Sequence, residues 1–384
     1  MNQPEMIQAI EAGILDVSFK ELYPQEPLKN CRERYIQILK EHQRLFQTSP
    51  VLLASSPGRT ELGGNHTDHN HGKVLASTVH LDAIAVASVG LKPLVQIVSK
   101  GYPSLEIATD ELSPKEEEKG QFEGIVRGIL SGFSNRGFSI KGFSAVIESR
   151  IPAGAGLSSS AGIELLLATL CNSFFANNSL SAYELARMGQ EAENQFFGKP
   201  CGLMDQLACA YGGVIKIDFQ TVPPKVYSVP FFLPGYTLLL VDTGSSHADL
   251  TEDYASIPLE MKQVAILLGA KVLGDLPKDR FLALLPKIRQ KVGDRALLRA
   301  LHFFQENERV DQMEKALQNR DIARYLQLVR SSGISSWTLV QNCVPLTNPS
   351  SQQIPLALAW AEEVLNGRGA MRVHGGGFAG AIQV

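Results

Sequence analysis

One glycine- and serine-rich segment contains the residue types of a phosphate-binding turn. It reads IPAGAGLSSSAG over residues 151–162, between a strand-like stretch (143–150) and an apolar, helix-like stretch (163–170). The backbone N–H groups of a first helical turn have no partner within the helix, and the helix dipole attracts anions there. Gly154 and Gly156 lack side chains, so a phosphate can approach the backbone closely. Three hydroxyls stand at the expected start of the helix: Ser158, Ser159 and Ser160.

The alternative interpretation of this segment is a capped helix after a flexible turn. Serine is a favoured N-cap residue, but a cap requires one serine rather than two glycines and three serines. The pattern therefore favours phosphate binding. It differs from a Walker P-loop because Gly-x4-Gly-Lys-Ser/Thr is absent from the sequence. It also differs from the protein-kinase loop, because Val-Ala-Ile-Lys and Asp-Phe-Gly are absent.

A second segment, PGRTELGGNHTDHNHG over residues 57–72, is dense in polar side chains. It lies between two expected strands and is expected to be a functional loop. The histidines His66, His69 and His71 suggest a metal site, but their spacing fits neither a helix-face pair nor a zinc motif. A polyhydroxylated ligand such as a sugar fits this mixture of donors and acceptors better.

The third segment, residues 193–206, places Asp205 among apolar neighbours. An ionised carboxylate in such surroundings is costly unless it is paired. Asp205 could simply cap the helix expected over 201–210, and the segment alone does not decide. A guanidinium such as that of Arg59 would keep the carboxylate ionised and able to accept a proton.

The elements that would position these segments follow from periodicity and turn residues. The sequence predicts helices over 28–46, 122–133, 163–170, 181–198, 201–210, 258–273, 280–292 and 295–317. It predicts strands over 51–54, 80–89, 143–150 and 236–242. The end of the sequence, 371–384, is predicted to form a strand, a glycine turn and a short strand that is either an edge or part of a longer chain.

Bulk properties predict a soluble globular protein of more than one domain. The 384 residues are long for a single core, and the prolines of 221–225 place a boundary between residues 1–222 and 223–384. The net charge of −3 argues against nucleic-acid or anionic-membrane partners. The first residues do not resemble a secretory signal, and stretches such as 81–91 are too short to span a bilayer. Five cysteines without Cys-x2-Cys spacing suggest a reduced, cytoplasmic protein.

Together the three segments resemble the GHMP kinase superfamily, and within it the galactokinase family. Residues 57–70 align without gaps with that family's Pro-Gly-Arg-Val-Asn-Leu-Ile-Gly-Glu-His-Thr-Asp-Tyr-Asn. Residues 152–161 match its Pro-x-Gly-x-Gly-Leu-Ser-Ser-Ser-Ala, and 201–206 match its Cys-Gly-x-Met-Asp-Gln. Residues 375–380 resemble its Gly-Gly-Gly-Phe-Gly-Gly. A weaker similarity covers 242–254, where the family has Asn-Thr-x-x-x-His-x-Leu-Ala-x-Ser-x-Tyr.

The resemblance implies a two-domain α+β fold with its active site in the cleft between the domains. It implies transfer of the ATP γ-phosphoryl group to the anomeric hydroxyl of D-galactose, giving α-D-galactose 1-phosphate. ATP and Mg²⁺ would be required, and sugar and ATP would be the small-molecule partners. The protein would be a monomer or a weak dimer.

The resemblance also implies residue roles, carried over position by position. Asp205 would be the catalytic base or orienting acceptor, and Arg59 would hold it ionised and offset phosphoryl charge. The expected ATP-binding residues are Gly154, Gly156, Ser158, Ser159, Ser160 and Phe122, with Phe122 where the family often has Trp. The expected sugar-binding residues are Glu61, Asn65, His66, Asp68, Gly202 and Tyr254. The expected Mg²⁺ ligands are Ser160 and Glu193.

Departures from the family pattern concern residues 57–72, which we call the sugar segment. Asn65 stands where the family usually has Glu, Glu61 where it has Asn, and His69 where it has Tyr. An amide loses the charge that strengthens a hydrogen bond, so the carboxylate has been lost or relocated to Glu61. One alternative is therefore a GHMP kinase for N-acetylgalactosamine, arabinose or glucuronate. A non-catalytic sugar sensor is a further alternative, against which the intact serine loop and Asp205 argue.

Overall fold

The long strand β2, Lys73–Val89, contributes residues to two units of the chain. The computed structural model describes residues 1–245 and 250–384. Unit 1 consists of Met1–Gly58, Val79–Pro152 and Ser158–Tyr211, and unit 2 of Arg59–Thr78, Ala153–Leu157 and Gly212–Val384. These segments interleave along the chain because β1 (Leu52–Gly63) and β2 both pass from one unit to the other. The consecutive domains 1–222 and 223–384 stay a prediction.

Unit 1 is built on a mixed sheet. The sheet contains β4 (Leu105–Ala108), β3 (Leu94–Ser99), β5 (Phe143–Ser149) and the second part of β2, in that order. β3 and β5 are parallel, whereas β2 and β4 pair antiparallel to their neighbours. Side chains alternate between the two faces of a strand. Because Phe143 and Val146 of β5 are both buried, both faces of this sheet are covered.

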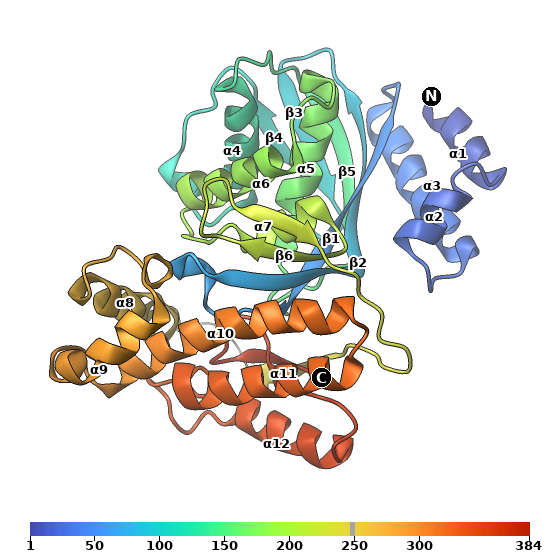
Figure 1. The fold of residues 1–384 in the computed structure, drawn as a ribbon. Helices are drawn as coiled ribbons and strands as arrows, with labels where there is room; N and C mark the ends of the chain where they lie inside the picture. The colour runs from blue at the N-terminus through green and yellow to red at the C-terminus, as the bar shows by residue number, and fades with distance from the viewer. Residues whose placement is uncertain (246–249) are drawn as a thin grey trace. The chain divides into compact units, whose positions relative to one another are not determined.

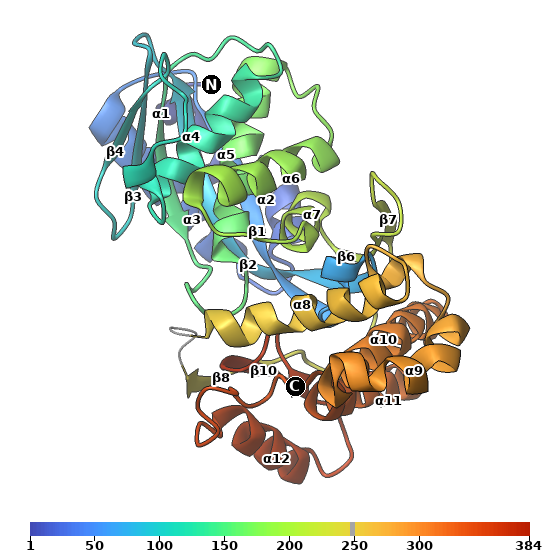
Figure 2. The same cartoon turned by 90° about the vertical axis from the view of Figure 1, so that its left-hand side faces the viewer.

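Helices cover the two faces of the unit 1 sheet (Figures 1 and 2). Val146 packs in one cluster with α1 (Gln3–Glu11), α2 (Asp16–Leu22) and α3 (Leu28–Phe46). Phe143, on the opposite face, packs against Phe174 of α5 with ring centroids 5.7 Å apart. The helical elements after β4 in unit 1 are η2 (Glu116–Glu118), α4 (Phe122–Ser134), α5 (Ser159–Ala176), α6 (Ala182–Glu191), the π-helix η3 (Ala192–Phe197) and α7 (Met204–Tyr211).

Several predicted elements of unit 1 are confirmed. The helix over 28–46 has the predicted bounds, because Cys31, Tyr35, Ile38 and Leu39 repeat at helical spacing and are buried. Ser181 opens α6 through a capping box, accepting from the Glu184 backbone N–H. α5 has the length and composition of a membrane span, but 61% of it is buried inside the structure, as expected of a core helix.

Unit 2 contains further strands of the mixed sheet and a separate three-stranded sheet. The first part of β2 pairs antiparallel with β6 (Val214–Asp218), which pairs with β7 (Lys225–Ser228). The second sheet has the order β8 (Leu240–Ser245), β10 (Gly380–Gln383), β9 (Arg372–Val373). The predicted strand–glycine turn–strand at the end of the sequence is therefore confirmed. The expectation that its last strand is an edge is wrong, because β10 has neighbours on both sides.

Helices are the main secondary structure of unit 2. They are the short η1 (Asp68–Asn70) and η4 (Leu273–Asp275), then α8 (Thr251–Leu267), α9 (Lys278–Val292), α10 (Asp294–Gln318), α11 (Ile322–Ser335), the π-helix η5 (Ser336–Val340) and α12 (Gln353–Leu365). Phe281 of α9 stacks on Phe304 of α10 at 5.1 Å within the buried cluster that joins α8, α9 and α10.

Two predicted elements of unit 2 are shifted. The strand expected over 236–242 begins at Leu240, because a turn with a Tyr236 N–H to Leu233 C=O bond precedes it. The helix expected over 258–273 is α8, which begins before Pro258 and carries this proline inside. Gly269, at φ +80°, follows its end, as is usual for a helix C-terminus.

Candidate active site

The polar segment 57–72 is mostly buried, and half of it is a strand rather than the predicted loop. β1 continues to Gly63, so Arg59 and Glu61 are strand residues, and the loop covers only 64–72. The exposed fractions are 7% for Arg59, 4% for Glu61 and 1% for Asn65. Buried polar groups are costly unless they are hydrogen-bonded. The partners of these side chains therefore explain how the segment folds.

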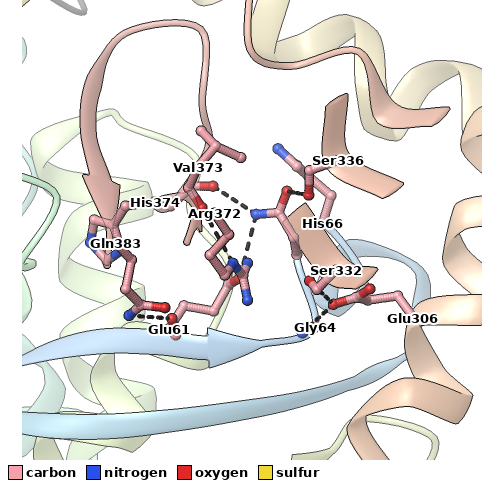
Figure 3. A network of polar contacts seen from close by, with 12 residues as sticks. Glu61, Gly64, His66, Glu306, Ser332, Ser336, Arg372, Val373, His374 and Gln383 are labelled. Carbon is pink, nitrogen blue, oxygen red and sulfur yellow. Dashed lines mark hydrogen bonds and ion pairs between the residues drawn. The ribbon is translucent and has the colours of Figure 1, made fainter. Parts of the chain in front are cut away.

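Glu61 forms a buried ion pair with Arg372 of β9 (Figure 3). The Arg372 side chain is 1% exposed and the Glu61 side chain 5%. Burial raises the pKa of Glu61, while Arg372 and Arg59 act in the opposite direction. The Gln383 amide donates to the Glu61 backbone carbonyl at 3.1 Å, which ties β1 to β10. The Glu61 carboxylate thus fastens the sugar segment to the C-terminal strands of unit 2.

Both the nitrogen and the oxygen of the Asn65 side-chain amide are hydrogen-bonded within unit 2. Its Nδ2 donates to the Gly375 carbonyl at 2.7 Å and to Glu61 Oε1 at 3.4 Å. Its Oδ1 accepts from Asn342 Nδ2 at 3.0 Å and from Ser336 Oγ, in η5, at 3.2 Å. A sugar hydroxyl could bond Asn65 only by replacing one of these partners. The predicted sugar contacts of Glu61 and Asn65 stay predictions.

Three aromatic rings gather beside the glycine turn 375–377. Tyr254 lies 5.3 Å from His66 and 6.2 Å from His69 between ring centroids, and a Cβ on Gly376 would clash with the tyrosine ring. His66 Nε2 bonds the Gly376 carbonyl at 2.9 Å, and burial lowers the pKa of His66 to about 3. His66 also has φ +57°, a strained conformation for a residue with a Cβ. Tyr254, by contrast, is 42% exposed.

The glycine-rich turn is held by its carbonyl groups in unit 2. Arg59 Nη1 donates to the Gly156 carbonyl at 2.7 Å, and His374 Nε2 bonds the same oxygen at 2.9 Å. The backbone N–H of Arg59 also donates to the Leu157 carbonyl at 3.1 Å. Gly154 and Gly156 have φ +76° and +74°, which favours glycine. This arrangement fixes the turn without using its N–H groups.

At the start of α5, in unit 1, the serines have different roles. Ser158 has φ +54° and precedes the helix, but its side chain does not cap it. Its hydroxyl instead donates to the Asp205 carboxylate. Asp205 is the second residue of α7 and is half-buried, rather than the residue that caps this helix. The capping alternatives are therefore not supported for Ser158 or Asp205.

Glu193 lies on the π-helix η3 and is buried. Its Oε1 accepts from Ser160 Oγ at 3.3 Å and from Lys199 Nζ at 3.0 Å. Its Oε2 accepts from Gln206 Nε2 at 3.0 Å. π-Helical turns are frequent at functional sites because the extra residue redirects a side chain. The structure thus brings together the two predicted metal ligands, Ser160 and Glu193, in unit 1.

A second buried carboxylate, Glu164, supports this cluster. Gln206 Nε2 donates to Glu164 Oε2 at 2.9 Å as well as to Glu193. Complete burial, and then the charge of Glu193, raise the pKa of Glu164 well above its usual range. Sequence analysis missed Glu164, Gln206 and Lys199. The signal for Glu164 was a single acid inside the apolar stretch 163–170.

The remaining predicted residues divide between the two units. Ser159, Phe122 and Gly202 belong to unit 1, with Phe122 at the start of α4 and partly exposed. Asp68 belongs to unit 2, where its Oδ1 lies 3.5 Å from His69 Nε2. In the part of the chain that the structure describes, no group of three or more His, Cys, Asp or Glu side chains could hold a metal. Of the segment that resembles the family around Tyr254, residues 246–249 lie outside the described residues.

Comparisons with known proteins identify the segments that carry these residues. Residues 124–213 match the GHMP kinases N terminal domain, and residues 40–89 match the galactokinase galactose-binding signature. Galactokinase of Lactococcus lactis is 31% identical over 299 residues, which cover 75% of this chain and 73% of that protein. Galactokinase of Clostridium beijerinckii is 28% identical over 356 residues, covering 90% and 88%.

Solved structures show the same relationship. A crystal structure of Lactococcus lactis galactokinase complexed with galactose has a TM-score of 0.76 and 26% identity, covering 90% of this chain and 88% of that one. Methanococcus jannaschii mevalonate kinase shares the fold, with a TM-score of 0.60 and 16% identity over 88% and 90% of the two chains. The motifs, the mixed helix and sheet fold and these similarities agree, and the chain belongs to the galactokinase family of the GHMP kinases.

Proposed function

We propose that this protein transfers the γ-phosphoryl group of ATP to the anomeric hydroxyl of D-galactose, giving α-D-galactose 1-phosphate. The observation that carries the proposal is the contact between Ser158 and Asp205. This contact places the half-buried carboxylate of Asp205 beside the serine-rich start of α5. A carboxylate in this place can take the proton of an attacking hydroxyl, and the helix start can bind the phosphates.

Asp205 and Arg59 carry the chemistry in this proposal. Asp205 receives the hydroxyl proton, and the Ser158 hydroxyl orients its carboxylate. Arg59 is fixed by its bond to the Gly156 carbonyl, and its guanidinium offsets the charge that builds on the transferring phosphoryl group. The reaction is a direct in-line transfer, because orientation and charge stabilisation are what phosphoryl transfer requires.

Ser160 and Glu193 fit Mg²⁺ by the chemistry of their donors. A hydroxyl and a carboxylate oxygen lie 3.3 Å apart, and both are hard oxygen ligands. Mg²⁺ is commonly held by one or two protein oxygens together with substrate phosphates and water. When bound there, the ion would neutralise the charge of the ATP phosphates. Gln206 holds the other oxygen of Glu193, which orients this ligand.

Galactose is proposed as the acceptor because the relative with a TM-score of 0.76 was solved in complex with galactose. The galactose-binding signature also covers Arg59 and the whole segment 57–72. The exchanged residues Glu61 and Asn65 keep a second candidate open, a kinase for another sugar. Their polar atoms are hydrogen-bonded inside unit 2. The exchange therefore changes the contacts that hold the sugar segment in place before it changes any contact with a sugar.

A panel of sugars tests the proposal. Turnover is followed by coupled ADP detection with galactose, N-acetylgalactosamine, arabinose and glucuronate. We expect galactose to have the highest kcat/KM. The matched control is Asp205→Asn, which should lower kcat with every sugar by about 10²- to 10⁴-fold, because it removes the general base. ATP affinity should stay near that of the unchanged protein.

The panel also separates the alternatives. A faster reaction with another sugar would replace galactose and leave the kinase chemistry in place. Galactose binding without ADP formation would indicate a sugar sensor. Unchanged turnover in Asp205→Asn would remove Asp205 from its role as the base.

We also propose that the protein acts in the cytoplasm as a monomer or weak dimer. ATP is an intracellular metabolite, and the net charge of −3 gives no attraction to nucleic acid or anionic lipid. Sugar and ATP are then the partners, with neither nucleic acid nor membrane required.

A further inference from the structure

Lys199 forms an ion pair with the proposed metal ligand Glu193. Its Nζ lies 3.0 Å from Glu193 Oε1. The Glu193 side chain is 4% exposed, whereas the Lys199 side chain is 62% exposed. The ammonium thus reaches a buried carboxylate from a stem that remains in solvent.

The local backbone brings Lys199 back to Glu193. Gly198 follows the π-helix η3 with φ +83°, a conformation that turns the chain at a helix end. The Lys199 N–H then donates to the Glu193 carbonyl at 3.0 Å. The next residues are fixed as well, because the Cys201 N–H donates to Asn194 Oδ1 at 2.7 Å. The position of Lys199 is therefore determined by the same π-helix that places Glu193.

The oxygen that Lys199 contacts is the one that a metal ion would use. Glu193 Oε1 also accepts from Ser160, whereas Oε2 is held by Gln206. Lys199 consequently lies on the Ser160 side of the carboxylate. A cation there offsets the charges of Glu193 and Asp205, both of which attract the Lys199 ammonium.

We propose that Lys199 occupies the cation position at Glu193 and competes with Mg²⁺ for it, so that this lysine sets the affinity of the site for the metal. This inference rests on the proposed function, because it takes Ser160 and Glu193 as the metal ligands. Metal binding then requires the ammonium to leave Oε1. The exposed stem of Lys199 lets it move into water without disturbing buried groups.

The size of the effect follows from the strength of the ion pair. Ion pairs with one solvent-exposed partner are weak, and the buried carboxylate of Glu193 places this pair at the upper end of their range. Removing the competing ammonium should therefore tighten metal binding by about threefold to fivefold, since about fivefold corresponds to 1 kcal/mol.

The experiment compares charge variants of the full chain without sugar or turnover. Mn²⁺ alone, which also prefers oxygen ligands, is titrated into the metal-free protein and free Mn²⁺ is followed by electron paramagnetic resonance. Lys199→Met removes the charge and Lys199→Arg retains it. Lys119→Met is the matched control, because the Lys119 stem lies beside Gly198 but its ammonium pairs with Glu116. Glu193→Gln tests the metal assignment.

We expect Lys199→Met to lower the Mn²⁺ dissociation constant about threefold to fivefold, with Lys199→Arg and Lys119→Met within about twofold of the unchanged protein. An unchanged or weaker Mn²⁺ affinity in Lys199→Met would overturn the proposal. So would a loss of metal-free AMPPNP affinity in this variant, which would make Lys199 a phosphate ligand. Unchanged Mn²⁺ binding in Glu193→Gln would overturn the metal assignment and the competition with it. Activity with galactose in the unchanged protein is a separate measurement, so the two failures are distinguishable.

Discussion

Glu61 shows that a charged residue of the sugar segment can serve the fold. Its carboxylate is paired with Arg372 and its backbone carbonyl with Gln383, and all three side chains are buried. A buried ion pair contributes little net stability, but losing one partner leaves a charge without compensation. The pair therefore makes the sugar segment dependent on β9 and β10.

Glu61→Gln should destabilise the protein by about 3–5 kcal/mol, because Arg372 would be left buried without its counter-charge. Equilibrium unfolding in urea measures the change in the free energy of unfolding. The double variant Glu61→Leu/Arg372→Met should recover most of the loss, since it removes both charges. Glu41→Gln, which breaks the exposed pair with Arg44, is the control and should cost less than about 1 kcal/mol. A similar small loss in Glu61→Gln would show that the pair is not essential.

Local motifs lead to predictions of the residues that carry the chemistry, but they do not indicate which residues support them. Arg59, Asp205 and Ser160 follow from local motifs. The partner of Glu61 could not be predicted, because Arg372 is 311 positions away in the sequence. Long-range pairing of this kind leaves no periodicity or spacing in the chain.

At the scale of elements, the π-helices η3 and η5 each carry a residue that is predicted to bind a ligand or that contacts one so predicted. η3 presents Glu193, and η5 presents Ser336 to the amide of Asn65. A π turn contains one more residue than an α turn, and it changes the direction of the side chains that follow. Periodicity does not reveal this feature, because the hydrophobic pattern of η3 continues that of α6.

The glycine-rich turn allows a matched pair of substitutions. Gly154→Ala and Gly156→Ala both place a Cβ at positive φ, which costs about 1 kcal/mol. A Cβ on Gly154 meets open space, whereas one on Gly156 comes within 2.8 Å of the His374 ring. We expect ATP affinity to fall less than about fivefold in Gly154→Ala and more than tenfold in Gly156→Ala, because 1.4 kcal/mol is a factor of ten. Calorimetric titration with AMPPNP measures both. Equal losses would mean that His374 does not constrain the turn.

Elements with strong local signals were predicted well. The helix over 28–46 has an uninterrupted apolar face, and the helix that follows Ser181 has a capping box. The strand expected over 236–242 was misplaced because its start is set by the preceding turn and by pairing with β10 rather than by its own residues. Residues 57–63 form a strand where the sequence predicts a loop, because their buried polar side chains hide the strand pattern.

At the scale of the whole molecule, buried histidines make stability depend on pH. Burial lowers the pKa of both His66 and His302 to about 3, whereas an unfolded histidine titrates near 6.5. The folded form therefore binds fewer protons, and stability is full above pH 6.5 and is lost as the pH falls towards 3. Between pH 7.5 and 5.5 each histidine should cost about 1.4 kcal/mol.

His302→Gln should remove about 1.4 kcal/mol from the loss of stability between pH 7.5 and 5.5, because the protonation difference of His302 disappears. Urea unfolding of both proteins at the two pH values tests this. His80→Gln, at an exposed histidine, is the control and should retain the full loss. An identical pH dependence in His302→Gln would show that His302 does not contribute.

The interleaved units have a consequence for synthesis of the chain. Residues 59–78 of unit 2 leave the ribosome early, but their partners on β9 and β10 are made some 300 residues later. Domains usually fold as units while the chain emerges, and transiently exposed segments are prone to aggregate. The side chains of Glu61 and Asn65 therefore stay hydrated, without these partners, until Arg372 and Gly375 have been synthesised. We expect the newly synthesised protein to depend on chaperones longest at residues 59–78, which include most of the segment proposed to recognise the sugar.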